Sequence, residues 1–332
     1  MNITITSSRF SPELGGTIVV ALRLAKALTK LGHEVTILTN TPVGDNTDSC
    51  FPYQVKRCLP LKENLKRIRH ADGVILIEMS LKWWALTRMA RKPHLVTHHA
   101  YPSVHGRKPS LELRVQRLLT SLSPSTGCSK MIANAWGKKV EVLPNPYDEN
   151  VFMPSDVSKD VDFIFAGRLI EEKGVLVFLK ALGLLRKETT QFQFAILGGG
   201  RQESEIRDQI TKLGLDENLI FFGETSSEGV AEWFQRSKTL VVPSVWREPF
   251  GLIALEALAC GARLICSDQP GLREASGELA DFFTTGDTNE LSLILEKHLK
   301  SKNTDSPDDV EAHLAKYRSE QVAELLVRKF NS

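Results

Sequence analysis

The residues best suited to chemistry lie in the stretch 238–267, where two glutamates flank the predicted start of a helix. Glu248 precedes that helix and Glu256 follows eight residues later. An apolar run of strand length comes first, and from Gly251 the apolar residues recur at helical spacing, which predicts strand, loop and helix. Phe250, Gly251 and Leu252 are predicted to start the helix. Their N–H groups lack partners within it, so they can donate to an anion or a hydroxyl oxygen.

Carboxylates beside free amides suit a ligand that carries both hydroxyls and phosphates, because carboxylates accept from hydroxyls and amides donate to phosphate oxygens. A nucleotide-sugar carries both groups. The structural alternative is that Glu248 is an acid favoured by the helix dipole and Glu256 a solvated helix residue.

A second group of candidates follows the strand predicted at 161–166. Arg168 and Lys173 share the loop before the next helix, and two cations at the carboxyl end of a parallel strand can hold a diphosphate by charge-assisted hydrogen bonds. Gly198 and Gly199 end the strand predicted at 192–197. Their bare backbone allows either close approach of a ligand or a tight turn.

The N-terminal half offers two further positions. Gly15 and Gly16 stand between a strand and a helix, a context that favours phosphate binding. The turn is not G-x-G-x-x-G and no acid ends the second strand, which argues against a dinucleotide enzyme. The second position is a pair of strand ends, where Glu78 follows the strand predicted at 73–77 and His98 and His99 follow the strand predicted at 95–97. His99 can reach a hydroxyl or phosphate, whereas His98 is expected to point toward the opposite face.

Alternating strands and helices must position these residues. Strands are predicted at 2–6, 35–39, 73–77, 95–97, 126–128 and 140–143, and then at 161–166, 192–197, 219–222, 239–242 and 264–266. This alternation predicts α/β structure with parallel sheets, whose ligands bind beyond the carboxyl ends of the strands. The proline-rich segment 144–154 separates the two series, and 332 residues suit two domains.

Composition narrows the class of protein. The hydrophobic content of 42% and charged content of 25% are globular values. No apolar run approaches the ~20 residues that span a bilayer, and the chain opens into a strand rather than a signal peptide, so we expect a cytoplasmic protein. The five cysteines lack metal spacing and are expected to be reduced packing residues.

Charge is distributed unevenly. Residues 1–150 hold 21 Lys and Arg against 11 Asp and Glu, and the remainder holds 21 against 29. A basic half of this size suits an anionic substrate or an anionic membrane surface. The helix predicted at 110–122, preceded by Arg107 and Lys108, is expected to pack its leucines on the sheet with its arginines in water; contact with a membrane surface is the alternative.

Six segments resemble, in order, the motifs of the retaining glycosyltransferases of family 4, which have the GT-B architecture. They read PELGG, VLPNPYDENVF, FAGRLIEEKG, ILGGG, FFGE and VPSVWREPFGLIALEALACGARLICSD and cover nearly the whole chain. The resemblance implies two Rossmann-like parallel-sheet domains facing across a cleft. Residues 1–147, with a final helix at about 317–332 that crosses back, would bind the acceptor, and residues 148–316 would bind the nucleotide-sugar donor.

The resemblance also implies roles for individual residues. Arg168 and Lys173 would bind the donor diphosphate and stabilise the leaving nucleotide, so that no metal or other cofactor is needed. Glu248 would contact the transferred sugar, with His99 nearby, although His98 stands where the family usually has an apolar residue. The donor-binding residues would be Gly15, Gly16, Gly198, Gly199, Glu224, Phe250, Gly251, Leu252, Ile253 and Glu256.

The activity that the resemblance implies is retaining transfer of a hexose from a nucleotide-sugar, by family frequency a UDP-sugar such as UDP-glucose. The acceptor would be a glycan or a lipid-linked glycan in polysaccharide biosynthesis, with no nucleic-acid partner. Two alternatives stay open: a sugar-nucleotide hydrolase or epimerase on the same scaffold, and a non-catalytic nucleotide-sugar-binding partner of a polysaccharide assembly complex. The base, sugar, linkage, oligomeric state and choice between same-face and covalent mechanisms also stay open.

Overall fold

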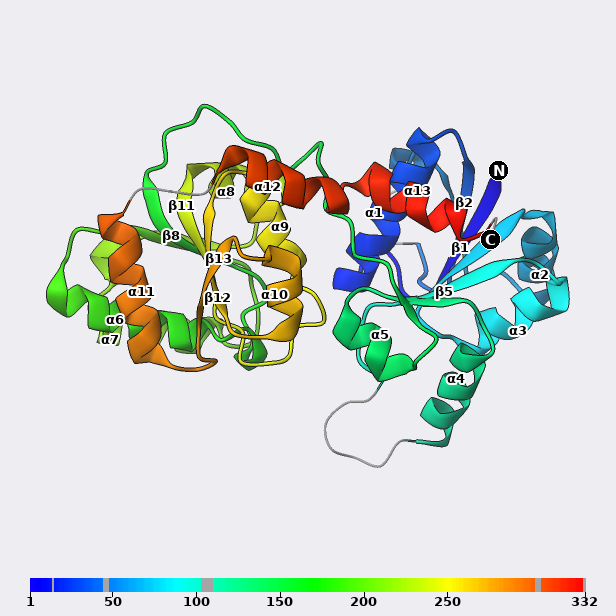
Figure 1. Cartoon of the computed structure of the whole chain (residues 1–332), viewed down its shortest axis with the longest axis horizontal. Coiled ribbons are helices and arrows are strands. Elements are labelled where there is room, and N and C mark those ends of the chain that lie inside the picture. The colour runs from blue at the N-terminus through cyan, green and yellow to red at the C-terminus, as the bar shows by residue number, and fades with distance from the viewer. Residues whose placement is uncertain (14, 44–47, 103–109, 302–305, 331–332) are drawn as a thin grey trace. The chain divides into compact units, whose positions relative to one another are not determined.

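The computed structural model describes residues 1–13, 15–43, 48–102, 110–301 and 306–330. The chain divides into two compact units, each a parallel sheet with helices (Figure 1). Unit 1 comprises Met1–Pro146 with Lys316–Ser332, and unit 2 comprises Tyr147–Ala315.

Unit 1 contains a seven-stranded sheet in the order β3-β2-β1-β4-β5-β6-β7. Its strands are β1 (Asn2–Ser7), β2 (Glu34–Thr39), β3 (Gln54–Arg57), β4 (Gly73–Ile77), β5 (His94–His98), β6 (Ser125–Gly127) and β7 (Glu141–Val142). Its helices are α1 (Gly16–Lys30), α2 (Leu61–His70), α3 (Leu81–Ala90), α4 (Leu111–Ser121), α5 (Lys130–Trp136) and α13 (Ser319–Arg328), with a short 3-10 turn at Asp48–Cys50. A second 3-10 turn, Ala315–Tyr317, includes the residues at which unit 2 ends and unit 1 resumes.

Apolar β-branched residues build the centre of this sheet. Ile5 of β1 lies in register between Ile37 of β2 and Ile75 of β4, and all three are fully buried. Consecutive residues of β4 are buried as well, so both faces of the central strands are covered. The α/β prediction is therefore confirmed for this half of the chain.

The last helix belongs to unit 1, as the resemblance implied. Helix α13 packs against α1, and its Val322, Ala323 and Leu326 are buried (Figure 1). An ion pair between Lys30 at the end of α1 and Glu320 at the start of α13 closes this contact.

Helix α4 corrects one prediction, since three leucines expected to pack on the sheet are exposed. Leu111, Leu118 and Leu122 are 78%, 58% and 67% exposed, whereas Leu113 is buried. The face of the helix that meets the rest of unit 1 instead carries Leu113, which is buried, and Gln116, whose side chain donates to the carbonyl of Met79 at 3.2 Å. Arg107 and Lys108 lie outside the described residues.

Unit 2 contains a six-stranded sheet in the order β10-β9-β8-β11-β12-β13. Its strands are β8 (Val161–Ala166), β9 (Phe194–Leu197), β10 (Leu219–Gly223), β11 (Ser237–Val242), β12 (Arg263–Ser267) and β13 (Ala280–Phe283). Its helices are α6 (Val175–Glu188), α7 (Glu203–Lys212), α8 (Ser227–Arg236), α9 (Leu252–Ala259), α10 (Pro270–Ser276), α11 (Thr288–Lys300) and α12 (Pro307–Leu314), with 3-10 turns at Glu171–Lys173 and Asp216–Asn218.

The core of unit 2 joins the sheet to α6, α7 and α11 and includes the aromatic rings of Phe163, Phe178, Phe194 and Phe283. Phe178 of α6 meets Phe194 of β9 edge to face at 6.1 Å. Such a core fixes the central strands, so the loops at their carboxyl ends are held in place.

The cysteine prediction is correct for three residues and wrong for two. Cys128, Cys260 and Cys266 are buried, whereas Cys50 and Cys58 are exposed and do not fill the core. All five are free thiols. Across the described part of the chain, every helix is too short or too polar to cross a membrane.

Candidate functional site

Glu248, in the loop between β11 and α9, is the centre of a polar cluster in unit 2. Its Oε1 accepts from Nζ of Lys173 at 2.6 Å and from Oγ of Ser244 at 2.7 Å. Glu248 is only 8% exposed, so the cation compensates a largely buried charge. No hydrogen bond from the described residues reaches Oε2, which leaves that oxygen for a ligand hydroxyl.

The turn after β12 holds the backbone of Glu248. Gln269 is buried; its Oε1 accepts from the Glu248 N–H at 2.9 Å, and its Nε2 donates to the Ser244 carbonyl at 2.6 Å. A Cβ added at Gly271 would lie 2.1 Å from the Glu248 carbonyl oxygen. Only glycine therefore allows this turn to approach so closely.

The Lys173 loop is fixed against the same segment. Gly174 follows Lys173 with φ of +70°, and a Cβ there would lie 1.9 Å from the Pro243 carbonyl oxygen. The N–H of Val245 donates to the Glu172 carbonyl at 3.0 Å. Two loops that follow the neighbouring strands β8 and β11 are thus joined through their backbones, and Lys173 faces Glu248.

Helix α9 begins at Leu252, after Gly251 at φ of +112°. The prediction that Phe250 starts this helix is wrong: Phe250 precedes it and is 2% exposed, because its ring belongs to the core. The N–H groups of Leu252 and Ile253 have no carbonyl partner within the helix, because both residues lie in its first turn. Glu256 is half-buried one turn further along.

Arg168 and the glycine turn lie at the ends of β8 and β9. Arg168 is exposed, and its guanidinium has no partner among the described residues. A Cβ at Gly198 would lie 1.9 Å from the Gly167 carbonyl oxygen, and one at Gly199 would lie 2.4 Å from Oε1 of Glu224. These glycines therefore have a packing reason within the protein, and their contact with a donor stays a prediction.

In unit 1 the two histidines at the end of β5 have different surroundings. The ring of His99 is bound on both sides, Nδ1 to Oδ1 of Asn145 at 2.7 Å and Nε2 to Oγ1 of Thr97 at 3.0 Å. Burial lowers the pKa of His99 below its usual value, although the nearby Glu78 carboxylate opposes the shift. His98 instead stacks on Trp136 at 3.9 Å between ring centroids.

The start of α1 has open space around its backbone. A Cβ at Gly15 or Gly16 would meet nothing within 4 Å, and the first turn carries no acidic residue. A phosphate would meet no repulsion from an acid of that turn.

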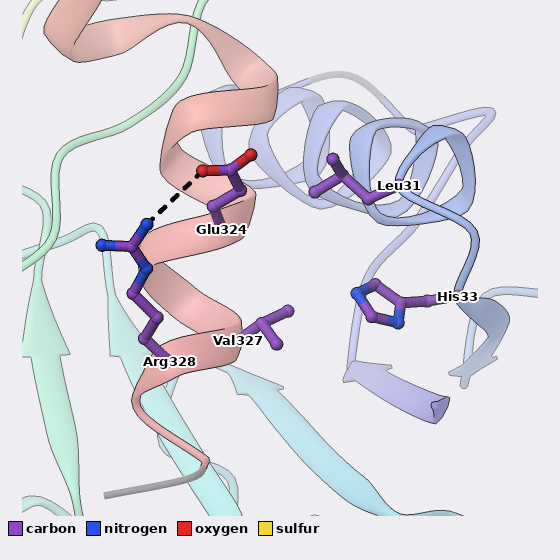
Figure 2. Close-up of a pocket in the computed structure, with 5 residues that line it drawn as sticks. All are labelled: Leu31, His33, Glu324, Val327 and Arg328. Carbon is purple, nitrogen blue, oxygen red and sulfur yellow. Dashed lines mark ion pairs between the residues drawn. The ribbon is translucent and has the colours of Figure 1, made fainter.

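A cavity of about 370 Å³ lies elsewhere on unit 1 (Figure 2). It is lined by Leu31, His33, Glu324, Val327 and Arg328, and Arg328 pairs with Glu324 at 3.7 Å. His33 directly precedes β2, so this cavity is at the amino end of that strand. The predicted site residues of unit 1 follow carboxyl ends or open α1, and none lines it.

The structure adds three residues to the predicted set: Asn145, Ser244 and Gln269. It also gives partners to Glu78, which the sequence places at the end of a strand. Asn145 and Ser244 lie in the quoted VLPNPYDENVF and VPSVWREPFGLIALEALACGARLICSD segments. Those positions were their only signals in the sequence, because a polar residue in a loop has no periodicity.

Two parallel α/β units with charged side chains and glycine turns at the carboxyl ends of their strands have the architecture of the GT-B class. A family model described as Glycosyl transferases group 1 matches residues 148–313, and one described as Glycosyltransferase Family 4 matches residues 14–151. The chain belongs to glycosyltransferase family 4.

Relatives and solved structures agree with this assignment. The uncharacterized glycosyltransferase MJ1607 of Methanocaldococcus jannaschii is 31% identical over 322 residues, which cover 82% of each chain. The D-inositol 3-phosphate glycosyltransferase of Arthrobacter sp. (strain FB24) is 27% identical over 80% of this chain and 76% of its own. The structure of Anabaena Alr3699/HepE in complex with UDP has a TM-score of 0.81 at 17% identity and covers 100% of both chains, which shows the shared fold.

Proposed function

We propose that this glycosyltransferase moves a hexose from a UDP-sugar such as UDP-glucose to a glycan or glycolipid acceptor in polysaccharide biosynthesis, with retention of configuration and without a metal ion. The observation that carries the proposal is the cluster of Lys173, Ser244 and Glu248, with the first turn of α9, whose N–H groups have no partner within the helix. It offers a cation and free amides for phosphates and a carboxylate oxygen for sugar hydroxyls.

The choice of UDP draws on the similar fold of Anabaena Alr3699/HepE, which has been solved in complex with UDP and with UDP-glucose. Thermal-shift screening against UDP-, GDP-, ADP- and dTDP-sugars tests it, because a ligand that binds only the folded protein raises the melting temperature. A selective rise with a UDP-sugar supports the proposal, whereas a rise with another base alone corrects the donor.

The main chemical step that this chain must assist is departure of the nucleotide from the sugar, during which negative charge develops on the diphosphate. Arg168 and Lys173 would stabilise the charge that develops on the leaving diphosphate, and Glu248 would hold the sugar. Turnover that is unchanged by a chelator would support the metal-free form. Anomeric configuration of the product, read by NMR, decides between retention and inversion.

Two substitutions test the site against matched controls. Glu248→Ala should abolish transfer with the fold kept, and Lys173→Ala should weaken nucleotide binding. Lys180 and Glu188 are exposed residues of α6 without partners in the described structure, so Lys180→Ala and Glu188→Ala are controls. Site variants that turn over donor like wild type would show that the assignment is wrong.

The alternatives differ in what they do with the donor. A hydrolase or epimerase consumes it without an acceptor, and a binding partner of an assembly complex binds it without turnover. Measuring UDP release with and without candidate acceptors separates the three, since release that depends on the acceptor favours the transferase.

We also propose that unit 1 contacts an anionic lipid surface through α4. Leu111, Leu118 and Leu122 are exposed on this helix beside Arg114, in the basic half of the chain. Apolar side chains that enter the headgroup region and a cation that pairs with lipid phosphates are the usual components of such a contact. Flotation with anionic vesicles should recover the wild type and lose Leu118→Ser; equal recovery with neutral vesicles would refute the electrostatic part.

A further inference from the structure

Glu78, the residue after β4, has a backbone conformation that its side chain disfavours. Its φ is +62°, in the left-handed region, where a Cβ crowds the backbone. Arg91 has φ of +55° but ends helix α3, a place where this conformation is routine. Glu78 and Cys58, which has φ of +50°, instead directly follow strands, and the N–H of each donates to a carbonyl of the neighbouring strand. Glu78 differs from Cys58 in the contacts of its carboxylate.

Those contacts lead to the end of β5. Oε1 of Glu78 accepts from the His99 N–H at 2.8 Å, and the N–H of Glu78 donates to the Thr97 carbonyl at 2.9 Å. Glu78 is therefore hydrogen-bonded to the residues on both sides of His98, Thr97 and His99. The left-handed turn is what lets the backbone and the carboxylate of one residue reach the same strand.

The other carboxylate oxygen faces a second unusual group. Oε2 of Glu78 lies 3.8 Å from Nδ1 of His98, whose ring is fully buried against Trp136. Neither ring nitrogen of His98 has a hydrogen-bond partner within the described structure. The Glu78 carboxylate thus lies beside a buried polar ring and, through its other oxygen, fixes the backbone of His99.

We propose that Glu78 is a positioning residue: it sets the place and the charge environment of His99 at the end of β5. The inference rests on the proposed function, in which His99 lies near the transferred sugar. Glu78 acts through its bond to the His99 N–H and through its proximity to the buried His98. Its left-handed backbone is the conformational cost of that arrangement.

The charges around His99 make the role measurable. Burial is the largest influence on the pKa of His99 and lowers it. The Glu78 carboxylate raises this pKa, whereas the neighbouring His98 lowers it. Glu78→Gln keeps an oxygen that can accept from the His99 N–H but removes the negative charge. The pKa of His99 should then fall further, and any acid limb of the pH–rate profile that reports His99 should move to lower pH.

Glu78→Gly tests the backbone contact, with Arg91→Gly as its control. Both glycines relieve a left-handed conformation, but only the first removes the bond to His99. We expect Arg91→Gly to raise the melting temperature with turnover unchanged. Glu78→Gly should keep a melting temperature near that of wild type while kcat falls roughly 10- to 100-fold, because small displacements at a site have effects of that size.

Histidine and amide NMR of His99 should accompany the kinetics. A displaced His99 amide resonance in Glu78→Gly and a lower ring pKa in Glu78→Gln support the proposal. Unchanged His99 signals in both variants, or wild-type kcat in Glu78→Gly, overturn it. If the wild type turns over no donor, the proposed function fails, and the NMR measurements still decide whether Glu78 positions His99.

Discussion

Replacing Gln269 with leucine tests whether the hydrogen bond that holds the Glu248 backbone is needed for catalysis, because the Glu248 side chain itself is kept. Gln269→Leu keeps much of the side-chain volume but removes the acceptor of the Glu248 N–H and one of two donors to the Ser244 carbonyl. That carbonyl still accepts from Oγ of Ser267 at 2.8 Å. The substitution therefore leaves one buried N–H without a partner.

An orphaned buried donor costs about 1–3 kcal/mol of unfolding free energy. For a domain of roughly 150–250 residues, each kcal/mol lowers the melting temperature by about 2–4 °C, so the expected drop is about 2–12 °C. The loop is also free to move, and a shift of Glu248 by about 1 Å can reduce kcat about 100-fold. Nucleotide affinity should change much less, because Lys173 and the start of α9 keep their own supports.

Calorimetry, steady-state kinetics and UDP titration measure these three quantities. Gln235→Leu is the control, since its Nε2 donates to the Met153 carbonyl in the same unit at 2.9 Å without touching the cluster. It should lower the melting temperature modestly and leave kcat unchanged. A Gln269→Leu protein that melts early but turns over at the wild-type rate would refute the idea that this bond holds Glu248 for catalysis.

Three other substitutions probe stability in unit 2. Gly174→Ala should lower the melting temperature by several degrees, because its Cβ would strike the Pro243 carbonyl and its backbone is left-handed; an unchanged value would contradict the contact. Lys159→Met should cost about 1–3 kcal/mol in urea unfolding, since Nζ donates to three carbonyls at the ends of α8 and α9, and a smaller loss than in Lys180→Ala would contradict it. Burial lowers the pKa of His298, so the unfolded chain binds its proton first and stability should fall as pH drops below about 6.5; His298→Asn should flatten that slope.

The sequence predicts the central strands of both sheets because they are continuous apolar runs. Their ends differ from the structure by one or two residues. The edge strands β3 and β13 are absent from the predicted set, since each is short and largely half-exposed. Such strands are specified by their neighbour in the sheet rather than by their own pattern.

The sequence indicates the residue types of the candidate site but not the contacts between them. Lys173 and Glu248 are 75 positions apart, and only the adjacency of β8 and β11 brings them together. Gln269 enters from β12, on the other side of β11. Spacing along the chain holds no information on these contacts. The predicted rotation of α4 is wrong for the same reason, because the face it buries is chosen by tertiary contacts such as those of Leu113 and Gln116.

The ion pair between Lys173 and Glu248 couples the two halves of the proposed donor site. The Nζ that would bind a phosphate also compensates a carboxylate that is 8% exposed. A diphosphate that draws Lys173 away leaves this charge with the hydroxyl of Ser244, which is costly unless sugar hydroxyls donate to it. The intact nucleotide-sugar should therefore bind more tightly than the nucleotide alone, and Glu248→Gln should reduce that difference by improving affinity for the nucleotide. Equal ratios of the two affinities in wild type and variant, measured by titration calorimetry, would show that the pair is not exchanged on binding.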